Sequence, residues 1–345
     1  MLQIKGGLQI ATDDYYIEHM QDGCDELHFE VPLSDPAYFA LNEEDRILET
    51  TEHQTYVVKT ISGGKSSAKI GCQLDLRDWK ADIKIDYAKT RSAFNHISGF
   101  MPGSWTLTEL PAAHSDTKTV EMRGPTPLDL ALQVQKSFAC AVRFDVSQKT
   151  ATLLWYEDLT PSNAYAVDTV NLRRAPEFKG RSTDMFTRLF PIGKDGLRIT
   201  DVNNGYDFVE NLTYTTDVIC KVWQDSRYED AAELMAAARK KVDEASQPVR
   251  SWKLDLIDLH RLNAEKWPDM GVPLFTILRL VDQNKGFSAN VQVVQDKIYP
   301  YYPEKNEITV ATNARSIQRT LRNIYKDLYD PNSEFFQKLF AGGIT

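Results

Sequence analysis

Cysteine is scarce in this chain, with four residues among 345. Cys24, Cys72, Cys140 and Cys220 lie far apart and form no C-x-x-C pair. This spacing argues against a structural zinc site and against a redox-active pair, because both need closely spaced thiols. We predict four reduced, buried thiols that pack as small apolar side chains, in preference to a structural disulfide.

Long apolar runs are also missing. No segment approaches the roughly 18 consecutive apolar residues that a membrane-crossing helix needs. Residues 1–16 turn acidic without the apolar core of a signal peptide. We therefore expect synthesis in the cytosol and no insertion into a membrane.

Basic residues are too few to balance the acidic ones. The sequence has 40 lysines and arginines against 49 aspartates and glutamates, a net charge of −9. An acidic surface repels phosphate groups, so binding of nucleic acid without regard to its sequence is disfavoured. Apolar residues make up 42% of the chain, which is ordinary for a globular protein and sufficient for two or three domains with their own cores.

The motifs of common enzyme classes are absent as well. The sequence has no G-x-G-x-x-G, no G-x-S-x-G and no H-E-x-x-H, so it supports neither a dinucleotide fold, nor a nucleophile elbow, nor a zinc-protease helix. Gly63-Gly64-Lys65-Ser66 is similar to part of a phosphate-binding loop, but Lys59 stands where that loop needs a glycine, and we predict a hairpin turn. We predict no enzymatic activity and no catalytic, cofactor-binding or metal-binding residues.

The chain has six histidines, which are His19, His28, His53, His96, His114 and His260. None has the spacing of metal ligands to another, and we interpret them as surface or locally hydrogen-bonded side chains. His28 and His53 have the acidic neighbours Glu30 and Glu52, but the sequence shows no convergence of these groups in space. Cys140 stands between two alanines, and apolar surroundings raise the pKa of a thiol and leave it inert.

Residues 1–85 have the pattern of short antiparallel strands. Apolar and polar residues alternate in Leu27–Val31 and Thr55–Ile61, as in strands with one buried face. After a glycine turn, Ala68–Leu76 has an apolar residue at every second position. This region predicts a first β-barrel-like domain.

Residues 86–165 have helical periods between strands. An apolar face formed by Tyr87, Phe94 and Ile97 predicts one helix from about residue 86. The sequence TPLD at 126–129 predicts the start of a second helix, with the threonine as its cap and the aspartate bonding back to it. Strands follow, so the region predicts an inserted α+β domain.

Residues 166–330 predict a second β-barrel-like domain with a helical insertion near 226–246. Ser226–Glu229 fits a capping box at the start of that helix, and Pro248 prevents its continuation. The strands expected after it are Ser251–Leu259, Leu274–Val281, Asn290–Tyr299 and Lys305–Thr312.

The end of the sequence predicts an amphipathic helix over 314–329 and an apolar C-terminal tail over 331–345. Arg315, Arg319 and Arg322 fall on one face of that helix, with Lys326 a turn further. We interpret this face as solvated, and the alternative is a docking face for an acidic partner or a neighbouring subunit. The tail either folds back on the core, which we favour, or packs on another chain.

The most informative stretch is Thr187–Thr213. Its pattern predicts three short strands joined by two tight turns. Gly193–Gly196 supplies the first turn, the alternating Leu197–Thr200 the middle strand, and Asn203–Gly205 the second turn. By itself this pattern indicates only an antiparallel sheet.

The identities of the residues in this stretch are more specific than their alternation of apolar and polar positions. RLFPIGKDGLRI, followed by VNNG and FVEN, resembles the signature segment of the prophage tail-endopeptidase family, the tail-associated proteins whose N-terminal part forms the baseplate hub of long-tailed phages. Gly103–Trp105, the segment from Val222 to Pro248, and Leu254–Leu259 agree with the family in order and spacing. Asp269–Val272 is a looser fit to a turn of the family.

The resemblance implies an α+β, mainly β fold in which two β-barrel-like domains flank an inserted α+β domain. It implies a homotrimer whose six barrel-like domains make a pseudo-sixfold baseplate hub. That hub would attach to the distal tail protein and meet other tail and baseplate proteins, with the tape-measure protein as a further candidate partner. It would close or line the tail channel, through which DNA passes without being bound specifically.

The family takes its name from a peptidase region that longer members carry after the hub, and the present sequence covers the hub part. We therefore expect a structural protein of the virion tail tip that is made in the cytoplasm of the bacterial host. Two alternatives stay open, a tail-borne peptidoglycan hydrolase or endopeptidase and a host-surface binding module. Six tryptophans scattered along the chain argue against the latter, because a binding surface would group them.

Overall fold

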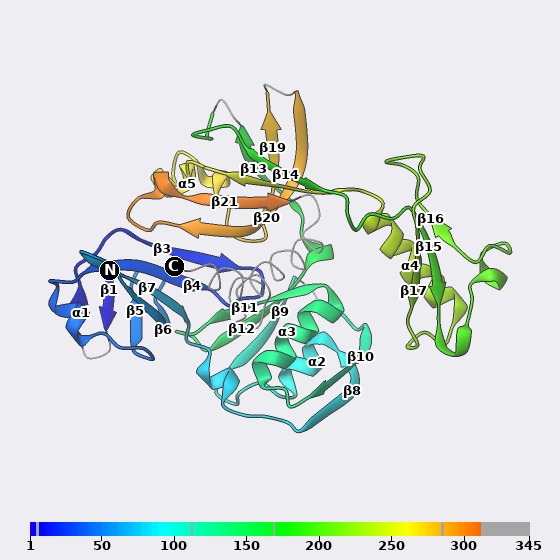
Figure 1. Ribbon diagram of the computed structural model, residues 1–345, viewed down its shortest axis with the longest axis horizontal. Helices are drawn as coiled ribbons and strands as arrows, with labels where there is room; N and C mark the ends of the chain where they lie inside the picture. Colours follow the sequence, from blue (N-terminus) through cyan, green and yellow to red (C-terminus); the bar gives the residue numbers. More distant parts are fainter. Residues whose placement is uncertain (5–6, 112, 168–169, 284–285, 312–345) are drawn as a thin grey trace, which may run out of the picture. The chain divides into compact units, whose positions relative to one another are not determined.

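The computed structural model describes residues 1–311, apart from 5–6, 112, 168–169 and 284–285 (Figure 1). The chain separates into two compact units, the first made of Met1–Glu177 and Trp252–Val310 and the second described over Phe178–Ser251. The fold is mainly β with several sheets, as predicted. The helix predicted at 314–329 and the tail at 331–345 lie outside the described residues. The predicted division at 85, 165 and 330 stays a prediction.

The largest sheet has 13 strands, and most of them belong to the first unit. Its order is β14 (Glu177–Arg181), β18 (Val249–Leu254), β21 (Glu307–Ala311), β20 (Phe287–Ile298), β3 (Tyr15–Met20), β4 (Glu26–Pro32), β7 (Ser67–Leu74), β6 (Gln54–Gly63), β5 (Arg46–Glu49), β1 (Leu2–Ile4) and β2 (Gln9–Ile10), with β19 (Ile277–Asp282) on β20 and β13 (Pro161–Val167) on β19. The strands predicted in 1–85 and after residue 250 are all present, with shifted ends. β14 and β18 are the segments through which the chain leaves the first unit and returns.

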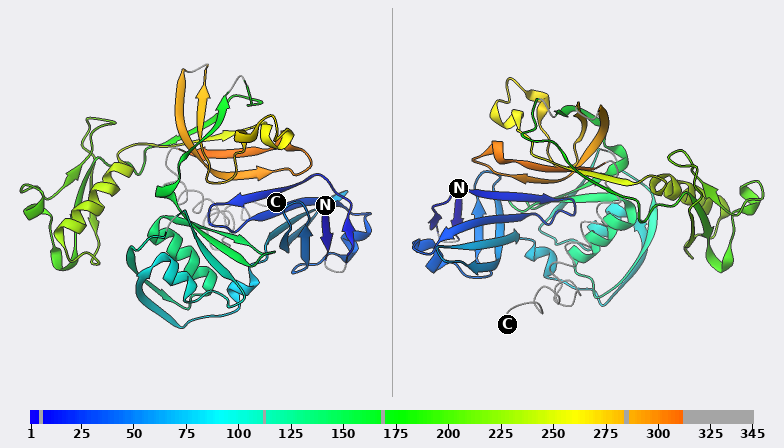
Figure 2. Two further views of the ribbon diagram at one scale, coloured as in Figure 1. Left: turned by 180° about the vertical axis from the view of Figure 1, so that it is seen from behind. Right: turned by 45° about the horizontal axis from the view of Figure 1, so that its top comes forward.

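The pairing of β3 with β20 joins the beginning of the chain to residues almost 300 positions later. Ile17–Met20 runs antiparallel to Gln295–Ile298, with His19 directly opposite Asp296. In Figure 1 the blue strand β3 lies beside the orange strand β20, and both views of Figure 2 show the same neighbourhood. No local sequence pattern predicts this pair, because alternation identifies strands and not their partners.

The GGKS segment that follows β6 is the turn of a hairpin, as predicted. Gly63 ends β6, Ser67 begins β7, and the Gly64 amide donates to the Ser67 carbonyl over 2.8 Å. A short helix, α1 (Pro36–Ala40), follows β4 and is capped by the Asp35 carboxylate.

Residues 77–158 add two smaller sheets and two helices to the first unit. The sheets are β11 (Cys140–Asp145), β12 (Thr150–Trp155) and β9 (Thr106–Leu110), and β8 (Asp86–Ser92) with β10 (Thr117–Arg123). The helices α2 (Ala93–Ser98) and α3 (Pro127–Phe138) contact strands of both sheets. The predicted capping box of α3 is confirmed, since the Thr126 side chain accepts from the Asp129 amide and Asp129 accepts in return.

The helix predicted from residue 86 is wrong in its first half. Tyr87 belongs to strand β8, and the helix begins only at Ala93, capped by Ser92. The apolar spacing of Tyr87, Phe94 and Ile97 misled the assignment, because β8 pairs along its whole length with β10 and the backbone of residues 86–92 is used in that ladder.

One buried cluster of apolar side chains runs from the N-terminal strands into the sheet β11-β12-β9. Trp79, in the short 3₁₀ helix Arg77–Lys80, is fully buried in it. Its ring meets those of Trp105 and Phe144 edge to face, with centroids 5.5 and 5.0 Å away. Such aromatic contacts favour one relative orientation of the packed layers. A second cluster fills the space around β18, β19, β20 and β21.

Short helices complete the first unit. They are α5 (Leu259–Leu262) and the 3₁₀ helices Tyr156–Asp158, Pro268–Met270 and Pro303–Lys305.

The second unit packs one helix on a small sheet. The order is β16 (Val209–Glu210), β15 (Arg188–Ile192) and β17 (Cys220–Gln224), and α4 (Ala231–Ala245) contacts β15 and β16. Its core includes Leu189, Leu234 and Val242.

Two expectations for the second unit are wrong. Leu197–Thr200 is not a strand, because the Gly193 amide bonds the Leu197 carbonyl and closes a compact loop around the 3₁₀ helix Lys194–Gly196, with a second one at Thr200–Val202. The helix is capped by Asp230, which accepts from the Glu233 amide, and not by Ser226. The positive φ expected of the turn glycines is present at Gly196 and Gly205.

Along the part of the chain that the structure describes, no helix combines the length and the apolar character needed to cross a bilayer.

Candidate functional site

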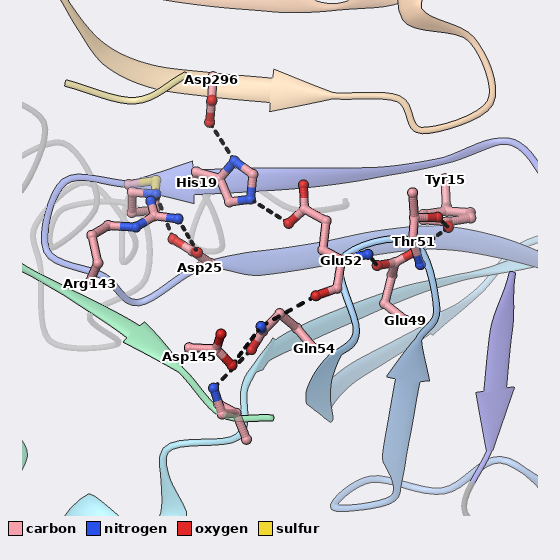
Figure 3. A network of polar contacts seen from close by, with 12 residues as sticks. Tyr15, His19, Asp25, Glu49, Thr51, Glu52, Gln54, Arg143, Asp145 and Asp296 are labelled. Atoms are coloured by element: carbon pink, nitrogen blue, oxygen red, sulfur yellow. Dashed lines mark hydrogen bonds and ion pairs between the residues drawn. The ribbon is translucent and has the colours of Figure 1, made fainter. Parts of the chain in front are cut away.

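The most concentrated polar structure of the first unit surrounds His19 (Figure 3). Strand β3 alternates buried and half-buried residues, and His19 follows Tyr15 and Ile17 on the buried side. The ring bonds two carboxylates, with Nδ1 2.7 Å from Asp296 Oδ1 on β20 and Nε2 2.9 Å from Glu52 Oε2 in the loop after β5. His19 therefore connects β3 to a neighbouring strand and to a loop.

The two carboxylates keep the imidazole charged. Burial acts to lower the pKa of His19, but Asp296 and Asp25 and the hydrogen bonds outweigh burial and hold the pKa well above its ordinary value. Burial acts to raise the pKa of Glu52, yet His19 and Arg261 hold it below its ordinary value. The pair is a buried ion pair at neutral pH.

The loop that carries Glu52 is held by a second carboxylate. Glu49 is fully buried and accepts from the Thr51 and Glu52 amides over 2.8 and 2.7 Å. It also accepts from the Tyr15 hydroxyl on β3 over 2.5 Å. Glu49 thus fixes the backbone of the loop independently of the contact between Glu52 and His19.

Arg143 brings β11 to the same place. Its Nη2 lies 3.6 Å from Asp25 Oδ2, and Asp25 accepts from the Met20 amide at the end of β3 over 2.9 Å. Burial acts to lower the pKa of Arg143, but Asp25, Asp296 and Glu52 raise it above its ordinary value. We call His19, Asp25, Glu52, Arg143 and Asp296 the junction cluster.

A neutral side chain makes a parallel connection. Gln54, at the start of β6, donates from Nε2 to Asp145 Oδ1 over 3.1 Å and accepts from the Val146 amide over 2.9 Å. Both partners lie at the end of β11, so the amide group clamps the strand end with two bonds. Together with the junction cluster it ties three regions of the first unit, the N-terminal strands, the sheet of β11 and strand β20 (Figure 3).

An open cleft of about 730 Å³ borders the junction cluster. His19, Glu52 and Arg143 form part of its wall, with Arg261 and Asp258 from the region of α5. The Arg261 guanidinium lies 3.6 Å from Glu52 and 3.5 Å from Asp258. Positive and negative groups alternate along this wall and are paired with each other.

The lining of the cleft does not present a nucleophile beside a base. Ser162 donates its hydroxyl to the Ile277 carbonyl, and His260 Nδ1 lies 3.0 Å from the Trp267 carbonyl. His19 is engaged on both nitrogens. Among the described residues that line the cleft, no serine or cysteine is hydrogen-bonded to a histidine, which acyl-transfer catalysis would need.

The remaining histidines are mostly bonded locally, as predicted. His96 is buried between the Tyr87 hydroxyl and the Lys118 carbonyl, and burial lowers its pKa. His114 bonds Asp158 and stacks on Trp155.

The thiols divide into two groups. Cys72 and Cys140 are buried, and burial raises the pKa of Cys140 to about 12, in line with the inert thiol predicted there. The prediction of burial is wrong for Cys220, which is exposed on β17, and holds only in part for Cys24, which is half-buried.

Sequence reasoning missed the junction cluster. A signal for it exists in the alternation of Tyr15–Met20, which puts His19 on the same side as two large apolar residues. A histidine in that position needs partners. The identity of the partners could not be found, because Asp296 is 277 residues away.

Comparisons with known proteins agree on one family of folds. Residues 174–321 match the family model described as prophage endopeptidase tail. No curated protein matches the chain in sequence.

Three solved structures superpose on nearly the whole chain. The prophage tail protein gp18 from Listeria monocytogenes EGD-e is 16% identical, with a TM-score of 0.60 over 93% of this chain and 94% of its own. The 43 kDa tail protein of prophage MuSo2 from Shewanella oneidensis is 10% identical, with a TM-score of 0.65 over 91% and 98%. A tail protein from Neisseria meningitidis MC58 is 9% identical, with a TM-score of 0.62 over 90% and 94%. At such identities the likeness shows the fold.

Proposed function

We propose that this chain is a structural component of a phage or prophage tail, since residues 174–321 match the model of the prophage endopeptidase tail family. The observation that carries the proposal is the shared fold, which covers at least 90% of this chain and of each of three tail proteins. Coverage of that extent in both directions means that the whole architecture is shared and not one common domain. The tail is accordingly its place in the virion.

The proposed role is mechanical. The junction cluster and the Gln54 clamp hold three regions of the first unit in one arrangement through largely buried hydrogen bonds and ion pairs. Networks of this kind specify one geometry more than they add stability. A subunit that transmits position to its neighbours in an assembly needs that property.

We further propose that the chain forms a homotrimeric hub at the tail tip and attaches to the distal tail protein. Light scattering of the purified protein tests this. We expect about three times the mass of the 39.3 kDa chain, either alone or on addition of the distal tail protein of the same phage. Negative-stain images of that particle should show a threefold ring. A monomer mass under both conditions contradicts the trimer.

We also propose that the protein has no enzymatic activity. The family name includes an endopeptidase, and the cleft beside the junction cluster is the described cavity in which such chemistry would be sought. Among its described lining residues, Ser162 and His260 bond backbone carbonyls and Arg261 pairs with Glu52, and no serine or cysteine is hydrogen-bonded to a histidine. Purified protein should give no clear zone on a gel that contains bacterial cell walls, beside a lysozyme control. A clear zone would overturn the purely structural role.

A further inference from the structure

Strands β3 and β4 bring together a nitrogen and two carboxylate groups at another place. Glu18 on β3 stands directly opposite Glu26 on β4, and Tyr16 stands opposite His28. Glu26 and His28 are two positions apart, so both point to the same face of the sheet as Glu18. One oxygen of each glutamate and one ring nitrogen of His28 all lie within 4.8 Å of one another.

This arrangement puts like charges face to face. Carboxylates directly opposite each other on paired strands repel, and the repulsion grows as water is removed. All three side chains are half-buried, with 20% of the Glu26 and 28% of the His28 side chain exposed. The pair therefore favours a positive charge or a proton between its oxygens.

Neighbouring groups surround the three side chains. Lys297 stands opposite Glu18 on β20, and its ammonium lies over the Tyr16 ring, 3.8 Å from the centroid, from where its charge still acts on Glu18. Gln295 donates its side-chain amide to Glu18, which orients that carboxylate. The Tyr16 ring stacks on the His28 ring at 4.9 Å and fixes its plane. The donors are thus held by neighbours on β3 and β20.

We propose that Glu18, Glu26 and His28 form a binding site for a divalent transition-metal ion of the zinc class. One imidazole nitrogen and two carboxylate oxygens are ligands that zinc accepts, whereas calcium and magnesium prefer oxygen alone. Tetrahedral bonds of about 2.0–2.2 Å place the donor atoms roughly 3.3–3.6 Å apart, so side-chain rotation must shorten the present spread of up to 4.8 Å by about 1.3 Å. His28 Nε2, now 3.0 Å from Glu26 Oε2, donates its hydrogen to that carboxylate, so binding of the ion displaces this proton and leaves the Nε2 lone pair for the metal.

The site lies outside the junction cluster and does not depend on the tail function proposed above. Sequence reasoning predicted no metal ligand and singled out Glu30 as the acidic neighbour of His28. In the structure Glu30 is exposed and bonds Ser67 and Lys69 on β7. The relevant acids are Glu26, two residues before His28, and Glu18 on the other strand. Only the register of β3 on β4 reveals them.

The test is a zinc titration of the tag-free protein after treatment with a chelator. The Cys220→Ser background is used throughout, because the exposed thiol is itself a zinc ligand. We expect one ion per chain by elemental analysis, and a melting temperature that rises with zinc concentration as binding to the folded state requires. Glu26→Gln and Glu18→Gln should each weaken binding by at least about tenfold, since loss of a mere supporting contact already costs that much.

The matched control is Glu30→Gln, which makes the same chemical change on the same strand outside the three-residue site. It should bind zinc as the parent protein does. The proposal is overturned if the parent binds no zinc, or if Glu26→Gln and Glu18→Gln bind as tightly as Glu30→Gln. Nuclear magnetic resonance of His28 identifies the alternative, since a charged imidazolium at neutral pH that zinc does not displace means a closed ion pair with Glu26.

Discussion

His19 shows how a charged side chain is kept on the buried face of a strand. Its two ring nitrogens each meet a carboxylate, so no polar atom of the ring lacks a partner. Removing one member of a buried ion pair costs more than the pair contributes, because the remaining charges stay desolvated. The loss of unfolding free energy on substitution of His19 therefore reports how much its contacts stabilise the packing of β3 on β20 and on the loop after β5.

We expect His19→Gln to lower the free energy of unfolding by about 3–5 kcal/mol at neutral pH. The glutamine leaves Asp296 and Glu52 without their positive partner, and Arg143 and Arg261 compensate only in part. Urea denaturation followed by circular dichroism measures the change. His53→Gln, on the exposed turn of the same loop, is the control and should leave stability within about 0.5 kcal/mol.

The same residue makes stability depend on pH. The folded pKa of His19 lies above its unfolded value, so its contribution is complete below about pH 6.5 and is lost as the pH rises through the folded pKa. Glu52 has a lowered folded pKa, and its contribution is lost as the pH falls through that value. The difference between the parent and His19→Gln should therefore be largest near pH 6.5 and shrink as the pH rises through the folded pKa of His19. A difference that does not shrink as the pH is raised contradicts the assignment.

The turn between β3 and β4 is an element whose geometry one glycine decides. Gly23 has φ of +79°, and a Cβ at this position would lie 2.3 Å from the Val142 carbonyl oxygen of β11. Neither the backbone of β11 nor that of the turn can move far, since Arg143 and Asp25 hold them from either side. The turn can approach β11 only because the side chain is absent.

We expect Gly23→Ala to destabilise the first unit by about 3 kcal/mol or more, the sum of left-handed strain and a backbone clash. Gly124→Ala is the matched control, since its φ of +59° is also left-handed but the nearest atom to its Cβ would be Ile83 Cδ1 at 3.8 Å. It should cost about 1–2 kcal/mol. Equal losses in the two variants, by thermal or urea unfolding, would contradict the close approach to β11.

At this scale the sequence predicts elements better than their partners. The capping box at Thr126 and the hairpin at Gly63–Ser66 were found correctly, because both depend on residues within a few positions of each other. Residues 86–92 were assigned to a helix, since their role is decided by pairing with β10. Leu197–Thr200 was assigned to a strand, although loop closure by Gly193 decides its form.

At the scale of the whole molecule, too, features that depend on contacts between distant residues could not be predicted from the sequence. The mainly β fold and the tail family were predicted from strand patterns and from the wording of 187–213, whereas the junction cluster was not. Its members come from β3, the turn between β3 and β4, the loop after β5, β11 and β20, and only the assembled first unit brings them together. The proposed metal site was missed for the same reason, although its residues are close in sequence.

The second unit has a core of its own, and β14 and β18, through which the chain enters and leaves it, are neighbours in the large sheet. Replacing residues 182–248 by a short glycine-rich turn should therefore leave the first unit folded. We expect a cooperative unfolding transition and a β-type circular dichroism spectrum. His19→Gln should cost the same in this shortened protein as in the full chain, because distant sites add independently. Aggregation without a transition would contradict the independence of the first unit.

The partnership of β3 with β20 also has a consequence during translation. A ribosome that adds 5–20 residues per second needs roughly 14–55 s to make the residues between His19 and Asp296. For all that time the edge of β3 that pairs with β20 stays exposed, and His19 lacks one of its two carboxylate partners. During this interval a chaperone, or β20 of another copy of the chain, can bind the exposed edge of β3 before its own β20 is made. We expect mispairing to begin between nascent chains that are translated from the same mRNA.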